Sequence, residues 1–189
     1  MPYWGLTYMV FLKINYRIKI FKQVKVILSY ILIFSAYHLG LAQVNNSAFY
    51  NMLDELLNHT VPEVKAKDID SGADILFLDA RAVEEYQVSH LPNAKHVGYE
   101  NFKTKNVKDI PKEQQIVVYC TVGYRSEKIA EKLQKLGFTN VSNLYGGIFE
   151  WVHANKALMY KDTLTTNVHT YNHDWSQWLL KGEKIYFTD

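Results

Sequence analysis

The chain has 189 residues, with 21 Lys and Arg, 19 Asp and Glu, and a formal net charge of +2. Five of the basic residues and none of the acidic ones lie within residues 1–42, so the remainder carries a formal net charge of −3. This balance leaves no excess of basic residues for binding nucleic acid, and the length beyond residue 42 suits one globular domain with a substantial core.

Residues 1–42 have the pattern of a secretory signal peptide. Basic residues precede an uncharged apolar run over 26–42, which ends in the small-x-small sequence Gly40-Leu41-Ala42 before Gln43. We expect cleavage after Ala42 and export to a bacterial periplasm. The alternative is an uncleaved N-terminal membrane anchor, and it is disfavoured because the run is shorter than the ~20 residues that span a bilayer.

The spacing of apolar residues predicts alternating helices and strands beyond residue 42. In chain order we expect a helix over 47–58, a strand over 75–78, a short helix over 83–87, a strand over 96–98, a polar loop over 100–115, a strand over 116–119, a helix over 126–136, a strand over 141–144 and a helix over 149–154. This alternation predicts an α/β fold with a central, mainly parallel sheet flanked by helices on both faces.

The predicted domain organisation has four parts: a signal peptide over 1–42, an N-terminal helical extension over 43–70, a core domain over 71–160 and a C-terminal tail over 161–189. In the tail, residues 163–172 are polar and read as irregular. Residues 174–181 contain two Trp at helical spacing and predict a short amphipathic helix, capped by Asn172 or Asp174. We expect it to pack on the domain, which is favoured over partner docking or a lid over a substrate channel.

Cys120 is the only cysteine, and it follows the β-branched run over 116–119 at a predicted strand-to-helix turn. Backbone N–H groups at such a turn, the helix N-terminus and Arg125 all favour a negatively charged sulfur, which is the nucleophilic form. The competing interpretation is a buried inert cysteine, the commoner fate of this residue type. The presence of Gly123 and Arg125 in the turn argues against it.

Four segments in this order resemble the rhodanese family of sulfurtransferases, over residues 74 to about 155. They are an apolar strand ending in Asp79-Ala80-Arg81 and followed by Glu84-Glu85-Tyr86, the stretch His90-Leu91-Pro92-Asn93-Ala94, the loop Cys120-x4-Arg125-Ser126, and the closing Gly146-Gly147-x3-Trp151. The chain departs from the family at Ser89 and Asn93, where Gly is usual. Asn tolerates the left-handed backbone that Gly supplies, so the second departure is mild.

The resemblance implies a rhodanese-like fold and a two-step transfer of sulfur. Cys120 would take a sulfane sulfur from a thiosulfate-type or persulfide-type donor, hold it as a persulfide and pass it to a thiol, sulfite or cyanide. The implied active-site loop comprises Thr121, Val122, Gly123, Tyr124, Arg125 and Ser126. The loop is one residue shorter than the Cys-x5-Arg of phosphatases that share the fold, which disfavours phosphatase chemistry. Thiosulfate is expected to be a poor donor, since many relatives have Arg in place of Thr121.

Several residues keep two interpretations. Arg125 either attracts an anionic donor or ties the loop to acidic groups. Asp79, Arg81 and Glu84 are expected to be mainly structural, with Asp79 and Arg81 supporting the loop after the strand. His90 is expected to hold backbone in place rather than act as a general base.

We predict neither a cofactor nor a metal site. Among the remaining histidines, only His169-x3-His173 has the spacing of metal ligands, and the residues between them form helices poorly. A single cysteine provides no resolving thiol, so the acceptor is expected to be a thioredoxin-like protein or a thiol of low molecular weight. The alternative function is a non-catalytic module of the same fold that binds a partner or senses redox state.

Overall fold

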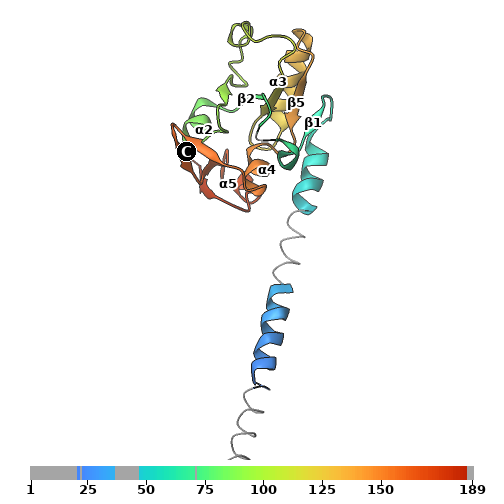
Figure 1. Ribbon diagram of the computed structural model, residues 1–189. Helices are drawn as coiled ribbons and strands as arrows, with labels where there is room; N and C mark the ends of the chain where they lie inside the picture. The colour runs from blue at the N-terminus through green and yellow to red at the C-terminus, as the bar shows by residue number, and fades with distance from the viewer. Residues whose placement is uncertain (1–20, 22, 37–46, 71, 187–189) are drawn as a thin grey trace, which may run out of the picture. The chain divides into compact units, whose positions relative to one another are not determined.

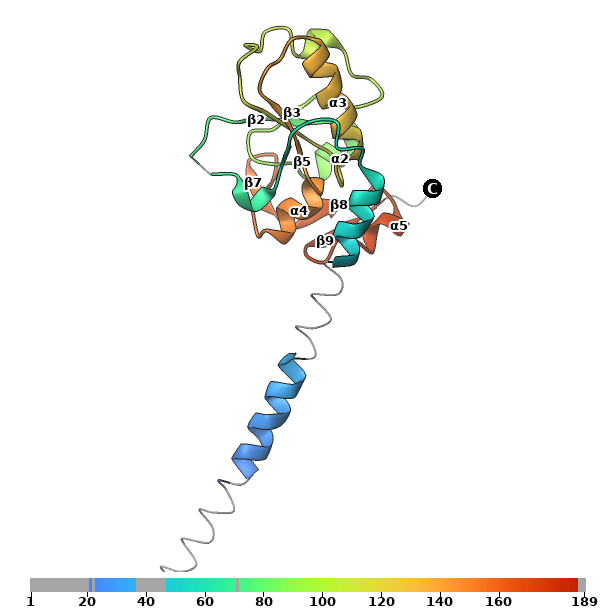
Figure 2. The ribbon, with the colours of Figure 1, turned by 90° about the vertical axis from the view of Figure 1, so that its right-hand side faces the viewer.

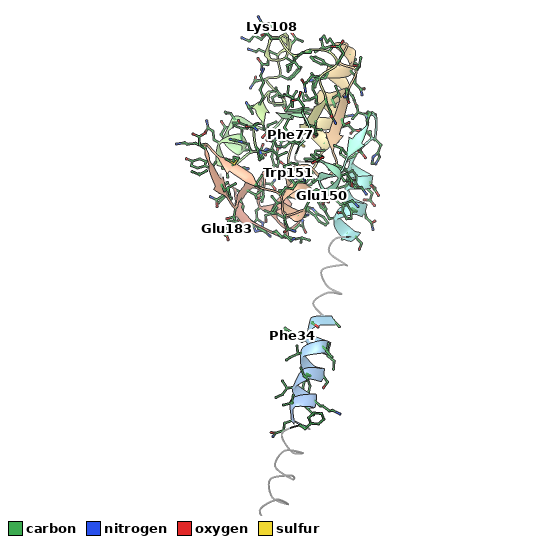
Figure 3. The ribbon with its side chains drawn as sticks, in the orientation of Figure 1. Phe34, Phe77, Lys108, Glu150, Trp151 and Glu183 are labelled. Carbon is green, nitrogen blue, oxygen red and sulfur yellow. The ribbon has the colours of Figure 1, made fainter. Side chains whose placement is uncertain are left out.

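The structure is a computed structural model that describes residues 21, 23–36, 47–70 and 72–186. The chain divides into two compact units, Met1–Ala48 and Phe49–Asp189. In the first unit, residues 23–36 form a helix whose apolar side chains, Phe34 among them, are exposed (Figure 3). Within the described ranges, no helix combines the length and the hydropathy needed to cross a membrane. The predicted cleavage site after Ala42 lies outside the described residues.

The second unit is built on a five-stranded sheet whose strands are all parallel (Figure 1). Its spatial order is β1-β5-β4-β2-β3, so β4 is the central strand. The carboxyl ends of parallel strands meet at one edge of a sheet, where ligands bind in α/β folds. The bounds are β1 (Glu63–Val64), β2 (Leu76–Asp79), β3 (Lys95–His96), β4 (Ile116–Tyr119) and β5 (Val141–Leu144).

Side chains of β4 alternate between two separate apolar clusters, one on each face of the sheet. Ile116 and Val118 join the cluster that contains the apolar stripe of α3 (Tyr124–Lys135). Val117 and Tyr119 join the other, which contains α4 (Gly147–His153) and the helix over 47–56. Helices therefore cover both faces, as the sequence predicts (Figure 2). The remaining helical elements before β5 are α2 (Val83–Val88) and the short 3₁₀ turns η1 (Ala66–Asp68) and η2 (Thr104–Asn106).

In this unit, apolar side chains pack against one another in the interior, and the polar loop between β3 and β4 lies at the periphery. Phe77 of β2 meets Trp151 of α4 edge to face, with ring centroids 5.4 Å apart (Figure 3). Lys108 lies in the long loop between β3 and β4, at the end of the unit away from α4. Residues 100–115 form the predicted polar loop, in which η2 is the only helical segment.

Helix α3 begins two residues earlier than predicted, at Tyr124 instead of Ser126. Gly123 is the reason, because its φ of 117° lets the chain turn straight from the cysteine loop into the helix. The helix ends at Lys135, one residue before the predicted end, and Gly137 follows with a φ of 88°. Leu136, the last residue of the predicted helix, is 37% exposed.

The prediction of an irregular stretch over 163–172 is also wrong. β7 (Thr163–Thr165) pairs antiparallel with β6 (Leu158–Tyr160), and β8 (Asn167–His169) pairs parallel with β9 (Glu183–Ile185). β7, β8 and β9 are three residues long and mostly polar, so local periodicity does not reveal them. Val168 is fully buried among residues of the α4 cluster, which indicates that tertiary packing fixes this segment.

The predicted helix over 174–181 is reduced to α5 (His173–Ser176). Of the two predicted caps, Asn172 is the one used: its side chain accepts a hydrogen bond of 3.0 Å from the Trp175 amide. Trp175 and Trp178 are half-buried and pack against the α4 cluster, in agreement with the expectation that the tail packs on the domain. Figure 1 shows α5 beside α4.

Candidate functional site

Cys120 follows the last residue of β4, at the edge where the strands end. The thiol is 1% exposed, and its Sγ accepts a hydrogen bond of 3.1 Å from the Gly123 amide. Tyr124 begins α3 directly after this turn, so the helix N-terminus lies beside the sulfur. An amide donor and the positive end of a helix dipole both stabilise a negative charge on sulfur.

Backbone hydrogen bonds from the start of α4 hold the cysteine loop in place. The Ile148 amide donates to the Cys120 carbonyl at 2.9 Å, and the Phe149 amide donates to the Thr121 carbonyl at 3.3 Å. Gly147 makes this approach possible, because a Cβ there would meet the Cys120 carbonyl oxygen and would lie 2.6 Å from that of Thr121. The closing Gly-Gly motif of the sequence therefore has a packing role against the loop.

Replacement of Gly147 by Ala is expected to destabilise the protein by at least about 2 kcal/mol more than replacement of Gly137. Both glycines have positive φ, 56° and 88°, so both variants carry backbone strain. A Cβ at Gly137 meets nothing within 4 Å, whereas one at Gly147 collides with loop carbonyls. Urea unfolding of the two variants measures the difference, and equal losses would contradict the packing role.

Arg125 is tied to an acidic partner that the sequence interpretation did not single out. Its Nη1 and Nη2 donate to the two carboxylate oxygens of Glu85 at 2.7 and 3.0 Å, and Nη2 also donates to the Thr121 hydroxyl at 2.8 Å. These contacts tie the loop to an acidic group, which is one of the two interpretations given for Arg125. Burial alone would lower the pKa of Arg125, but the bond to Glu85 and the charge of Cys120 raise it.

Glu84 was expected to be structural, and it is exposed; its neighbour Glu85 is buried and makes the contacts. Besides Arg125, Glu85 accepts from the Thr121 hydroxyl at 3.0 Å and from the Ala82 amide at 3.1 Å, at the start of α2. Burial would raise the pKa of Glu85, yet the hydrogen bond and charge of Arg125 outweigh it, and the pKa is lowered. Both glutamates lie in the first turn of α2, so the sequence alone does not distinguish them.

We expect the free energy of unfolding to fall in acid, because the Glu85 carboxylate becomes protonated. Because the pKa of Glu85 in the folded state is below its usual 4.5, the carboxylate contributes stability that is present above that value. This contribution is lost as the pH falls through the lower folded value. The free energy of unfolding, measured from about pH 7 to pH 3, should fall more steeply for wild type than for Glu85→Gln. Glu84→Gln is the exposed control and should keep the wild-type slope.

Asp79 and Arg81 form a fully buried ion pair beneath the site. The Arg81 Nη2 lies 2.7 Å from the Asp79 Oδ2, and its Nε donates to Asp79 Oδ1 at 3.0 Å. The same Nη2 donates to the Ser89 carbonyl at 2.6 Å, so the pair joins the end of β2 to the residue after α2. Burial would lower the pKa of Arg81, and Asp79 raises it instead. The expected supporting role of this pair agrees with these contacts.

His90 makes its contacts with backbone groups and with a neighbouring aromatic ring. Its main chain exchanges two hydrogen bonds of 2.9 Å with Met159, and its ring stacks on Tyr86 with centroids 4.3 Å apart. Its Nδ1 lies 3.1 Å from the Leu91 carbonyl. His90 is not among the described residues that line the cavity at Cys120, so the contacts favour the structural interpretation.

A cavity of about 360 Å³ opens at the cysteine. Five of the seven predicted loop residues line it, namely Cys120, Thr121, Val122, Tyr124 and Arg125. Gly123 instead forms the backbone turn, and Ser126 is buried behind it, where its hydroxyl donates to the Asn143 side chain at 2.7 Å. The sequence interpretation missed the other lining residues, which come from three separate segments without a shared motif: Leu56, Tyr99, Glu100, Tyr171 and Trp175.

No group of three or more His, Cys, Asp or Glu that could hold a metal ion occurs in the part of the chain that the structure describes. His169 and His173 make different contacts. The His169 Nδ1 accepts from the Tyr171 amide at 3.1 Å, whereas His173 begins α5. The two therefore have different structural surroundings.

Comparison with known proteins gives one family match and several partial relatives. The model of the family described as "Rhodanese-like domain" matches residues 60–154, half of the chain. The tRNA uridine(34) hydroxylase of Hamiltonella defensa is 36% identical over 113 residues, which cover 54% of this chain and 32% of that relative. The "Adenylyltransferase and sulfurtransferase uba4" of Ogataea parapolymorpha is 29% identical over 102 residues, 54% of this chain and 25% of that relative.

The chain thus spans a third or less of the length of these two relatives. Among solved structures, the BH2092 protein of Bacillus halodurans superposes with a TM-score of 0.48 and 26% identity, over 60% of this chain and 85% of that one.

Proposed function

This chain belongs to the rhodanese-like domain family, and we propose that it is a sulfurtransferase that carries a sulfane sulfur on Cys120. The observation that carries the proposal is the hydrogen bond from the Gly123 amide to the Cys120 sulfur, at the floor of a cavity beyond the end of β4. A family relative is named as a sulfurtransferase, which supports the same reaction class.

The proposed reaction has two steps and needs no external oxidant or reductant. In the first, the Cys120 thiolate attacks the outer sulfur of the donor, the donor's S–S bond breaks, and the leaving group departs with the electron pair. In the second, an acceptor thiolate, sulfite or cyanide attacks the terminal sulfur of the persulfide. The Cys120 thiolate is thereby released for another cycle.

The loop residues have distinct parts in this proposal. The Gly123 amide would stabilise negative charge on the sulfur in each anionic state. Hydrogen bonds from the Ile148 and Phe149 amides hold the loop carbonyls. The cradle, meaning the loop backbone around the Cys120 sulfur, is therefore formed before the donor binds. Thr121 and Arg125 are committed to Glu85, and they keep the loop joined to α2.

The acceptor is proposed to come from outside the chain, because Cys120 is the only cysteine. A thioredoxin-like protein or a small thiol would remove the sulfur. Without such an acceptor, the persulfide should persist on the isolated protein.

The proposal is tested by the intact mass of the purified full-length protein after exposure to thiosulfate or to a polysulfide. We expect a gain of one sulfur atom, which cyanide removes and prior alkylation of the thiol prevents. No gain from any donor, while the thiol alkylates readily, would overturn the proposal. That outcome would favour a partner-binding or redox-sensing module.

A further inference from the structure

The cavity at Cys120 has an aromatic wall that lies outside the family match. Tyr171 and Trp175 line the cavity, and both follow residue 154, where the match to the family model ends. Tyr99 and Tyr124 add two further aromatic side chains to the lining. The residues after the matched domain therefore form part of the space in which a donor must bind.

The wall is held by a set of local hydrogen bonds. Tyr171 has a φ of 69°, and its amide donates to the His169 Nδ1 at 3.1 Å. The Thr170 amide donates to the Ile185 carbonyl at 2.8 Å, which ties this turn to β9. Asn172 caps the helix that carries Trp175. These bonds hold the backbone from which both aromatic side chains extend toward the cavity.

The charge of the cavity does not suit a small dianion. Arg125 is the only basic residue in the lining, and both of its terminal nitrogens are bound to Glu85. The ring of Tyr171 lies against the same guanidinium, with the Cζ 5.2 Å from the ring centroid. Glu100 adds a further carboxylate to the lining. A thiosulfate dianion would therefore find no uncommitted basic side chain among these residues.

The size of the cavity also favours an organic donor over a small dianion. At about 360 Å³ it falls within the range of roughly 300–1,000 Å³ typical of sites that bind organic ligands. Aromatic walls bind apolar and aromatic groups through burial of area and through ring contacts. The space beside the thiol thus suits a donor with an organic body.

We propose that Tyr171 and Trp175 determine donor specificity, selecting a sulfane sulfur carried on an organic molecule with an apolar or aromatic body over inorganic thiosulfate. This inference rests on the proposed sulfurtransferase function. In the step that it concerns, the Cys120 thiolate takes the terminal sulfur and the organic fragment departs as its anion. For benzenethiosulfonate the products are the Cys120 persulfide anion and benzenesulfinate, and for thiosulfate they are the same persulfide and sulfite.

The two donors form a matched pair of probes, because benzenethiosulfonate carries a phenyl group in place of one oxygen of thiosulfate. With cyanide as the acceptor, thiocyanate formation by the full-length protein gives kcat/KM for each donor. We expect the wild type to favour benzenethiosulfonate by about tenfold or more. Tyr171→Asn, which tolerates the positive φ, and Trp175→Ala should each lower this preference by about fivefold or more, mainly through a higher KM for the organic donor.

Tyr160→Ala is the control, since Tyr160 is a similarly exposed aromatic residue that does not line the cavity. It should keep the wild-type preference. An unchanged preference in a folded Tyr171→Asn protein would overturn the inference, as would a wild type that favours thiosulfate. Tyr171 is 54% exposed, so this variant should fold even if loss of Trp175 disturbs packing. Failure of the proposed function would look different, because no donor would then load sulfur on Cys120.

Discussion

Cys120→Ser is expected to reduce sulfur transfer by at least about a thousandfold with every donor. A serine hydroxyl in the same place is not ionised at neutral pH, and it lacks the sulfur atom on which a persulfide forms. The cradle would persist, since the Ile148 amide binds the backbone carbonyl at this position and not the side chain. Thiocyanate formation from a saturating donor and cyanide measures the loss.

The structural control for this variant is its unfolding midpoint. Cys120 is buried, and Ser is of similar size, so the free energy of unfolding should change by less than about 2 kcal/mol. A folded Cys120→Ser protein that retains a substantial fraction of the turnover would refute the assignment of this residue as the sulfur carrier.

Asp79→Ala should have the largest effect on stability, a loss of about 3–5 kcal/mol. Arg81 is fully buried, and without the carboxylate its charge would have no acidic partner in the ion pair. The change would also remove the acceptor for the Arg81 amide, which Asp79 Oδ1 binds at 2.9 Å at the end of β2. Denaturant unfolding measures the loss, which is a large part of the usual stability of a domain.

Two comparisons separate the ion pair from a general effect of losing a carboxylate. Asp162→Ala removes an exposed carboxylate and should change stability by about 0.5 kcal/mol or less. Asp79→Leu combined with Arg81→Met replaces the pair by apolar side chains, and it should recover part of the loss. If Asp79→Ala is as stable as Asp162→Ala, the pair has no supporting role.

The bounds of the central strands were predictable, most clearly for β4, which reads as a short apolar run. The bounds of β4 and β5 agree with the predicted 116–119 and 141–144, since the residues are buried on both faces of a parallel sheet. The cysteine turn was predictable for a related reason, because its strand, its glycine and its helix are consecutive in the sequence. Because these elements follow one another directly, the sequence predicts the position of Cys120 without knowledge of the rest of the fold.

The parts of the site that depend on distant contacts were not predictable. Glu85 and Glu84 are neighbours with the same side chain, and only the docking of α2 beside the loop decides that Glu85 meets Arg125. Tyr171 and Trp175 reach the cavity through β8 and β9, whose parallel pairing joins residues that are far apart in sequence. Neither relationship leaves a periodic pattern that sequence analysis detects.

The backbone of the cysteine loop is held by contacts that do not depend on its exposed side chains. Main-chain bonds from Ile148 and Phe149 hold the loop carbonyls, and Gly147 supplies only the room for that approach. Exposed side chains such as Tyr124 take no part in these bonds. Proteins that evolve from this chain could therefore change such side chains, and with them the donors that bind, while the loop backbone stays the same. The constraint on divergence falls on the glycines more than on the residues that face the cavity.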